Sequence, residues 1–284
     1  MSVRTLILGC GDVGTRLGLA LAERGHEVWG LRRDAARIPG PIHALGGDLA
    51  RPETLPRWPA GLDLVFYTAA ADDPSEAAYT AAYVDGLRNA LASITDQGCA
   101  PRRLFYTSST AVYAQHEGEW VDERSPTVPE HHGGRILLAG ERLAAASVAA
   151  TTVVRLAGIY GPGRTRLIDG IRAGELHCGG AIAEITNRIH SVDCAGFLAH
   201  LATLDEPAPL YLGVDDEPAD RCSVFHWLAE RLGAPDPHRP SPASASSRRA
   251  GNKRCSNALL RATGYRLRYP TFREGYAALL AERA

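Results

Sequence analysis

Apolar residues in the first half of the chain gather in short runs that are separated by amphipathic stretches. Runs rich in β-branched and other apolar residues predict five strands, at Thr5–Leu8, Glu27–Leu31, Leu64–Thr68, Arg103–Thr107 and Thr151–Leu156. Apolar positions at helical spacing predict helices at Val13–Arg24, Ser75–Ile94 and Arg135–Ala146. Strands that alternate with helices and are apolar on both faces indicate a parallel sheet with helices on each side. The segment His43–Leu45 is a weaker strand signal, and its register in the sheet is not defined by the sequence.

The pattern degrades after Pro162. Helices are predicted there only at Ser223–Leu232 and Phe272–Glu282, and the tract Pro235–Gly251 is biased toward Pro, Ser, Ala and Arg, which is typical of a loop or lid. Glycines cluster at Gly170, Gly174, Gly179 and Gly180. We therefore expect an α/β fold, a Rossmann-type doubly wound parallel sheet with a small C-terminal substrate lobe. The expected bounds are 1–165 for the large domain, with about 188–215 returning to it, and 166–187 and 216–284 for the lobe.

Length and charge narrow the class of protein. The chain has 284 residues, which suffices for a sizeable core, and a formal net charge of −1. No run approaches the roughly 18 apolar residues of a membrane helix, and the first residues do not read as a cleavable signal. The near-neutral charge argues against a nucleic-acid partner. We expect a soluble cytoplasmic protein with no membrane partner.

The six cysteines are scattered and form no close pair in the sequence: Cys10, Cys99, Cys178, Cys194, Cys222 and Cys255. This spacing excludes the common C-x-x-C zinc and redox motifs. We therefore expect buried small side chains and neither disulfides nor a metal site.

A glycine-rich turn follows the first predicted strand at once and opens the first helix. It reads Gly9, Cys10, Gly11, Asp12, Val13 and Gly14. In that setting the first glycine permits the tight turn, the second lets a pyrophosphate approach the backbone, and the third lets the helix pack on the strand. The helix N-terminus favours the anion. The turn predicts a dinucleotide site, with Asp12 as a residue of the helix start.

The residues that follow the second strand bear on which dinucleotide binds. An NAD site usually presents an acid there, whereas this chain has Arg32 and Arg33, which suit a 2′-phosphate. NADP is therefore favoured over NAD, and the alternative is that both arginines are solvated and Asp34 binds the ribose. Strand ends further along the chain supply the other predicted cofactor residues: Asp48, Leu49, Thr68, Ala69, Ala70 and Thr107.

The chain resembles the short-chain dehydrogenase/reductase superfamily, in its extended, NAD-dependent epimerase/dehydratase-like form. The likeness rests on the glycine-rich turn, on Gly47–Leu49, and on the stretches Thr107–Tyr113, Arg155–Gly163 and Arg188–Asp193. It implies a nucleotide cofactor on the N-terminal domain and a substrate held by the C-terminal lobe. It also implies a homodimer through the helices at Ser75–Ile94 and Arg135–Ala146.

The catalytic pair of this superfamily is missing. The family uses a Tyr four residues before a Lys, together with a Ser or Thr that Ser109 matches. Aligned on Glu141, the Tyr position holds Gly133 and the Lys position holds Leu137, and the chain's only lysine is Lys253. This departure is similar to atypical members of the YeeZ type, whose helix also carries Gly-Arg in place of the pair.

Two explanations of the missing pair stay open. In the first, another group supplies the proton; Ser109, His131 and His132 are the candidate catalytic residues, since an imidazole pKa of ~6.5 suits proton transfer near neutrality. Tyr113, Tyr160 and Arg135 are further groups that could supply the proton. In the second, the protein binds a dinucleotide without turning it over. We thus expect an NAD(P)-binding oxidoreductase or epimerase/dehydratase-like enzyme, or alternatively a dinucleotide-binding regulator or sensor.

The C-terminal half carries basic residues that could close over an anionic substrate such as a nucleotide sugar: Arg164, Arg166, Arg188, Arg248, Arg249, Lys253 and Arg254. The simpler interpretation is that these basic side chains form a solvent-exposed face. His190 and Asp193 are expected to fix a loop between the domain and the lobe.

Overall fold

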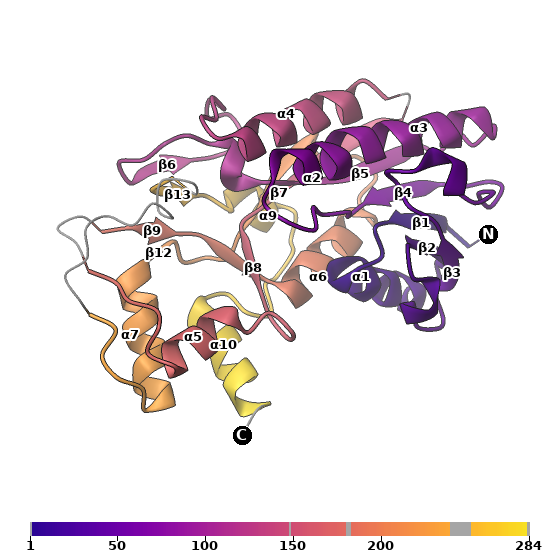
Figure 1. Ribbon diagram of the computed structural model, residues 1–284. Coiled ribbons are helices and arrows are strands. Elements are labelled where there is room, and N and C mark those ends of the chain that lie inside the picture. The colour runs from indigo at the N-terminus through magenta and orange to yellow at the C-terminus, as the bar shows by residue number, and fades with distance from the viewer. Residues whose placement is uncertain (1, 148, 180–182, 239–250, 283–284) are drawn as a thin grey trace. The chain divides into compact units, whose positions relative to one another are not determined.

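A seven-stranded sheet forms the centre of the computed structural model, which describes residues 2–147, 149–179, 183–238 and 251–282 (Figure 1). Its strand order is β11-β7-β5-β4-β1-β2-β3. Strands β1 to β5 pair in parallel, with Leu6 of β1 opposite Trp29 and Val65. The strands are β1 (Arg4–Leu8), β2 (Glu27–Arg32), β3 (His43–Gly46), β4 (Leu64–Tyr67), β5 (Arg103–Ser109), β7 (Ala150–Leu156) and β11 (Leu210–Gly213).

Helices cover both faces of this sheet (Figure 1). Helices α2, α3 and α4 lie on one face, and α1 and α6 lie on the other, so the predicted doubly wound α/β fold is confirmed. The bounds are α1 (Asp12–Glu23), α2 (Glu76–Thr80), α3 (Gly86–Asp96), α4 (His132–Ala145) and α6 (Ser191–Leu201). A π-helical turn, Ala81–Asp85, joins α2 to α3 inside the single helix that the sequence predicted. Single 3₁₀ turns lie at Ala35–Arg37, Pro52–Thr54 and Thr110–Val112.

The core of the sheet holds apolar side chains and one buried ionic network. The Arg155 guanidinium donates to both carboxylate oxygens of Glu141, from Nε at 3.0 Å and from Nη2 at 2.7 Å. Ser108 Oγ donates to the same carboxylate at 2.6 Å. Because all three side chains are buried, the network ties α4 to the adjacent strands β5 and β7 where no water competes.

The chain folds into two compact units. The first contains Met1–Val112, Pro129–Arg155 and Cys194–Tyr211; the second contains Tyr113–Val128, Leu156–Asp193 and Leu212–Ala284. The predicted bounds differ from this division mainly at Tyr113–Val128, which the sequence placed in the large domain. This segment carries β6 (Glu119–Val121), which pairs in parallel with β13 (Lys253–Cys255), and that pairing joins it to the C-terminal part of the chain.

The second unit consists of short elements around a separate apolar cluster, which includes Ile168, Phe225, Leu228 and Phe272. Its helices are α5 (Arg166–Arg172), α7 (Arg221–Leu232), α9 (Ala258–Ala262) and α10 (Phe272–Ala281). Besides β6 and β13, its strand pairs are β8 (Gly158–Tyr160) with β10 (Arg188–His190), and β9 (Ile185–Thr186) with β12 (Ala219–Asp220).

Asp193 holds a segment within the second unit, whereas the sequence placed it at a loop between the domain and the lobe. Its carboxylate accepts hydrogen bonds from the backbone N–H groups of Arg268 and Tyr269, at 2.7 and 3.0 Å, and from the Tyr265 hydroxyl at 3.1 Å. These bonds hold the segment that leads into α10.

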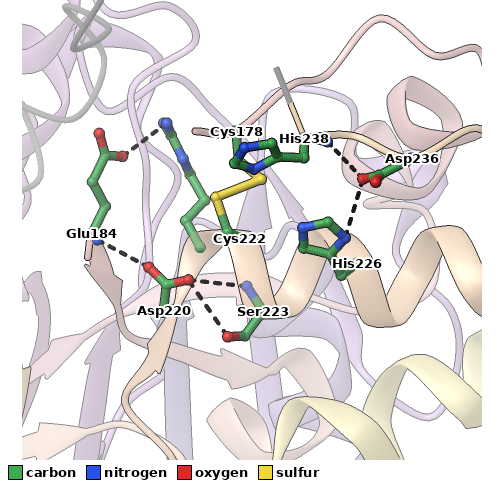
Figure 2. The surroundings of a disulfide bond; sticks show 9 residues. Cys178, Glu184, Asp220, Cys222, Ser223, His226, Asp236 and His238 are labelled. Atoms are coloured by element: carbon green, nitrogen blue, oxygen red, sulfur yellow. Dashed lines mark hydrogen bonds and ion pairs between the residues drawn. A yellow bond between two sulfur atoms is a disulfide. The ribbon is translucent and has the colours of Figure 1, made fainter. Parts of the chain in front are cut away.

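The expectation that the chain contains no disulfide is wrong for two of the six cysteines. Cys178 and Cys222 form a disulfide in the second unit, with their Cα atoms 5.3 Å apart (Figure 2). Cys222 lies in the first turn of α7, and Cys178 is held beside residues 237–238 by a backbone hydrogen bond to the Pro237 carbonyl. The cysteines outside this disulfide are Cys10, Cys99, Cys194 and Cys255, and all but Cys99 are buried, as predicted.

Candidate functional site

The glycine-rich turn connects β1 to α1 as the sequence predicted, and two of its glycines are required by the protein itself. Gly9 has a φ of +87°, and a Cβ there would overlap the backbone of Ala69. A Cβ on Gly14 would lie 2.8 Å from both the Gly9 carbonyl oxygen and Thr68 Oγ1. These two glycines allow the turn and the close approach of α1 to the sheet.

Gly11 is different, because no atom of the described chain crowds the position that a Cβ would take there. Its φ is −84°, and a Cβ would have only the Gly9 carbonyl oxygen within 4 Å, at 3.9 Å. Gly11 is also the N-cap of α1 and supplies no side-chain acceptor for the first N–H groups of the helix. An open space beside uncapped N–H groups fits the pyrophosphate of a dinucleotide.

Asp12 and Val13, the first two residues of α1, lie next to Gly11. Val13 is buried, and Asp12 Oδ1 accepts a hydrogen bond from Arg16 Nε at 2.9 Å, one turn along the helix. The Asp12 carboxylate is thus partly neutralised by an arginine, which reduces its repulsion of an anion at the helix start.

Arg32 is the last residue of β2 and Arg33 follows it, but their surroundings differ. The guanidinium of Arg33 is paired with Asp72, through Nη1 and Oδ2 at 2.8 Å and Nη2 and Oδ1 at 2.7 Å. The hydrogen bond from Arg33 lowers the pKa of the Asp72 carboxyl. Arg32 is half-buried at the end of β2, and no ion pair of its guanidinium occurs among the described residues. Asp34 is the N-cap of a 3₁₀ turn and is exposed.

The remaining predicted cofactor residues also lie in the first unit. Thr68 Oγ1 donates to the Gly9 carbonyl at 2.9 Å, and Thr107 Oγ1 donates to the Tyr67 carbonyl at 3.0 Å, so both hydroxyls brace the carboxyl ends of the strands. Ala69 packs against Gly9, and Ala70 follows it in the same loop. The Asp48 carboxylate accepts from the Ala50 N–H at 3.0 Å and from Arg51 Nε at 3.3 Å, while the Leu49 carbonyl accepts from Asn89.

The candidate catalytic residues occupy the end of β5 and the start of α4. Ser109 Oγ accepts from the Ala111 N–H at 3.2 Å. His131 is the N-cap of α4, and its Nδ1 accepts from the Gly133 N–H at 3.1 Å. His132 Nε2 lies 3.1 Å from the Pro74 carbonyl; since a carbonyl only accepts, this bond requires the Nε2–H tautomer. The two imidazole rings lie against each other at a tilt of 41°, with centroids 3.9 Å apart.

Gly133 and Leu137 occupy the positions of the family's Tyr and Lys, and both are buried. An aromatic ring lies directly against Gly133. A Cβ there would lie 2.9 Å from Cε1 of Tyr79, on α2, so the Tyr79 ring fills the space in front of the helix start. Tyr79 also contacts the rings of Tyr83 and His132, with centroids 5.3 and 5.9 Å away. The sequence analysis missed Tyr79; its spacing of four residues from Tyr83 was the available signal.

The chain's only lysine belongs to the second unit, whereas the positions of the missing pair lie on α4 in the first. Lys253 is 1% exposed, and its Nζ donates to the Tyr113 carbonyl at 3.1 Å. Burial lowers the pKa of this ammonium. Of the predicted basic set in that unit, Arg188 is buried and Arg254 donates to the Gly118 carbonyl, whereas Arg248 and Arg249 lie outside the described residues.

The part of the chain that the structure describes contains no candidate for a membrane-spanning helix or for a metal site. No helix there combines the length and the apolar character needed to cross a bilayer. No group of three or more His, Cys, Asp or Glu side chains there is arranged to hold a metal ion.

Curated relatives match over most of the chain. A 3-diazoavenalumate denitrifying reductase from Streptomyces is 30% identical, over 96% of this chain and 99% of its own length. A 2-alkyl-3-oxoalkanoate reductase from Stenotrophomonas maltophilia is also 30% identical, over 80% and 74%. Protein YeeZ of Escherichia coli is 28% identical over 94% of this chain and 96% of its own, which confirms the resemblance to the YeeZ type.

A solved structure and a family model agree with these relatives. An NAD-dependent epimerase/dehydratase structure from Methylobacillus flagellatus superposes with a TM-score of 0.81 at 36% identity, covering 100% of this chain and 99% of the other. The model of the NAD dependent epimerase/dehydratase family matches residues 5–196. With the dinucleotide turn in its expected place on the Rossmann-type sheet, the chain belongs to the NAD dependent epimerase/dehydratase family.

Proposed function

We propose that this protein is an NADP(H)-dependent reductase of a carbonyl-type substrate. The observation that carries the proposal is Gly11, the one glycine of the turn that the protein's own packing does not require, which stands at the uncapped start of α1. Two relatives at 30% identity are named reductases, which favours reduction over epimerisation. The substrate class stays broad, and a nucleotide sugar is the alternative to a simpler carbonyl compound.

The preference for NADP(H) rests on Arg32. Its half-buried position at the end of β2 is where a Rossmann-type site meets the 2′ position of the adenosine ribose. A guanidinium there suits a 2′-phosphate, and no ion pair within the described residues occupies it. Bound NADPH would supply the hydride.

Ser109, His131 and His132 are the proposed catalytic residues. The Ser109 hydroxyl can donate a hydrogen bond to the substrate oxygen while its lone pair accepts from Ala111. His131 or His132 would donate the proton that the oxygen gains on reduction, replacing the absent tyrosine. Each imidazole is oriented by a backbone group: His131 by the Gly133 N–H in α4, and His132 by the Pro74 carbonyl in the loop before α2. These bonds limit the positions from which the rings can donate a proton.

The test of the cofactor site is Gly11→Val. A branched side chain fills the space where the pyrophosphate must lie, so we expect NADPH binding measured by calorimetry to be lost. The space beside Gly11 is open and the poorer N-cap costs about 1 kcal/mol, and circular dichroism of the variant checks that it is folded. Unchanged NADPH affinity in a folded variant would refute the proposed site.

The test of the catalytic residues is turnover with a panel containing a 3-oxoalkanoate, an aromatic ketone and a nucleotide sugar. Ser109→Ala and the double variant His131→Ala/His132→Ala should each lower the rate of NADPH oxidation by about 10²–10⁴-fold. Their NADPH affinities should match the wild type. Rates within a few-fold of wild type for both variants would remove these residues from the reaction.

A dinucleotide-binding regulator is the second candidate, favoured by one observation. The positions of the family's acid/base pair hold Gly133 and Leu137, and Leu137 is 2% exposed, so no titratable group stands at either place. A wild-type protein that binds NADPH tightly and oxidises it with no member of the panel would favour this function over the reductase.

A further inference from the structure

The ion pair between Arg33 and Asp72 joins two loops at the carboxyl edge of the sheet. Arg33 directly follows β2, and Asp72 lies in the loop that follows β4. Two parallel hydrogen bonds of 2.7 and 2.8 Å connect them, the geometry that orients an arginine against a carboxylate most strictly.

The strand order determines what lies beneath this pair. β1 is hydrogen-bonded to β2 on one side and to β4 on the other, and all three run in parallel. Neighbouring strands are ~4.8 Å apart, so a contact between the loops after β2 and β4 must pass across the carboxyl end of β1. That end carries the Gly9–Gly14 turn.

The two sides of the pair are held in place independently of it. On the β4 side, the Asp73 carboxylate accepts from the Ser75 N–H at 2.8 Å, and the Pro74 carbonyl is bonded to His132. On the β2 side, Arg33 stands between the last residue of the strand and the N-cap of a 3₁₀ turn. The side chains of Arg33 and Asp72 can therefore separate and rejoin while their backbones stay near one another.

The pair does not serve mainly to stabilise the fold. Its side chains are 62% and 65% exposed, and ion pairs as exposed as this contribute little to stability. An unpaired Asp72 carboxylate beside the turn would repel a bound anion, whereas the paired carboxylate is neutralised by Arg33. The pairing of Asp72 with Arg33 is therefore explained by a negatively charged ligand beside it.

We propose that the Arg33–Asp72 pair is a bridge that closes over the pyrophosphate of the bound dinucleotide and slows its release. This inference rests on the proposed dinucleotide site and removes Arg33 from the contacts that distinguish NADP(H) from NAD(H). The bridge must open for the dinucleotide to leave, and NADPH and NADH are retained by it equally.

The experiment measures the dissociation rates of NADPH and NADH by stopped-flow displacement in wild type and in Asp72→Asn. Electrostatics alone predicts slower release from Asp72→Asn, because the substitution removes a negative charge beside an anion. A bridge predicts the opposite: release of both cofactors becomes about two- to fivefold faster, the factor that corresponds to an exposed pair of about 0.5–1 kcal/mol. The charge-swapped variant Arg33→Asp/Asp72→Arg should restore the slow release.

A matched control is the exposed pair Arg88–Asp85, at 2.6 Å on the α3 side of the π-helical turn. Asp85→Asn should leave both dissociation rates unchanged. Release from Asp72→Asn that is as slow as or slower than from wild type overturns the bridge while the proposed function stands. Failure of the wild type to bind either dinucleotide overturns the proposed function instead.

Discussion

Arg32 and Arg33 are adjacent in sequence, yet only the structure separates their roles. Arg33 is held by Asp72, whereas Arg32 is half-buried beside the turn. Loss of a hydrogen bond to a charged group costs about 1.5–3 kcal/mol, so Arg32→Ala should lower the ratio of NADPH to NADH affinity by roughly tenfold or more. Arg33→Ala should change both affinities by the same factor. Calorimetric titration with each cofactor measures both ratios, and a ratio that falls only in Arg33→Ala would reverse this assignment.

At the same scale, the sequence predicted the backbone of the cofactor site better than its side chains. Gly9 and Gly14 follow from the turn itself, because the spacing of the glycines and their place after a strand define the conformation. The partner of Arg33 could not be predicted, since Asp72 is brought to it by the order of the strands. Tyr79 was missed for a related reason: it meets Gly133 through the packing of α2 on α4.

At the scale of elements, continuous apolar runs predicted five of the seven strands of the sheet to within two residues at each end, whereas β11 was not predicted. The weak segment that became β3 is largely exposed and gave no register, and β6, which pairs with the distant β13, was not predicted. The π-helical turn Ala81–Asp85 was not predicted, because apolar spacing does not distinguish it from the α-helix on either side. Helix α6 is apolar nearly all round and therefore lacks the amphipathic pattern that reveals a surface helix.

The network of Glu141, Arg155 and Ser108 offers a test at this scale. Glu141→Ala leaves the Arg155 guanidinium buried without its carboxylate, and we expect the free energy of unfolding to fall by about 3–5 kcal/mol. The double variant Glu141→Leu/Arg155→Met removes both charges and should recover much of that loss. Urea unfolding of the three proteins gives the values. A double variant no more stable than Glu141→Ala would show that the charge left behind is not the cause.

For the whole molecule, the chain crosses between two compact units several times, and a sequence read in order gives no sign of where it crosses. The segment Tyr113–Val128 looked like part of the first domain because it directly follows β5. Its pairing with β13 joins it to residues far along the chain. The disulfide escaped prediction in the same way, since its two cysteines are 44 residues apart and resemble no local motif.

The disulfide predicts that oxidation stabilises one unit and not the other. Cys178–Cys222 crosslinks two segments of the second unit and fastens the first turn of α7, which Asp220 caps; one turn further, His226 pairs with Asp236 (Figure 2). A crosslink of this kind contributes about 2–4 kcal/mol, so Cys222→Ser should speed hydrogen exchange in Arg221–Leu232 and leave β1 and α1 unchanged.

Cys99→Ser, which removes a free thiol of the first unit, is the control. Thiol titration of denatured, unreduced protein should find the four free cysteines. Six reactive thiols, together with exchange in α7 that is identical in the wild type and in Cys222→Ser, would contradict the crosslink.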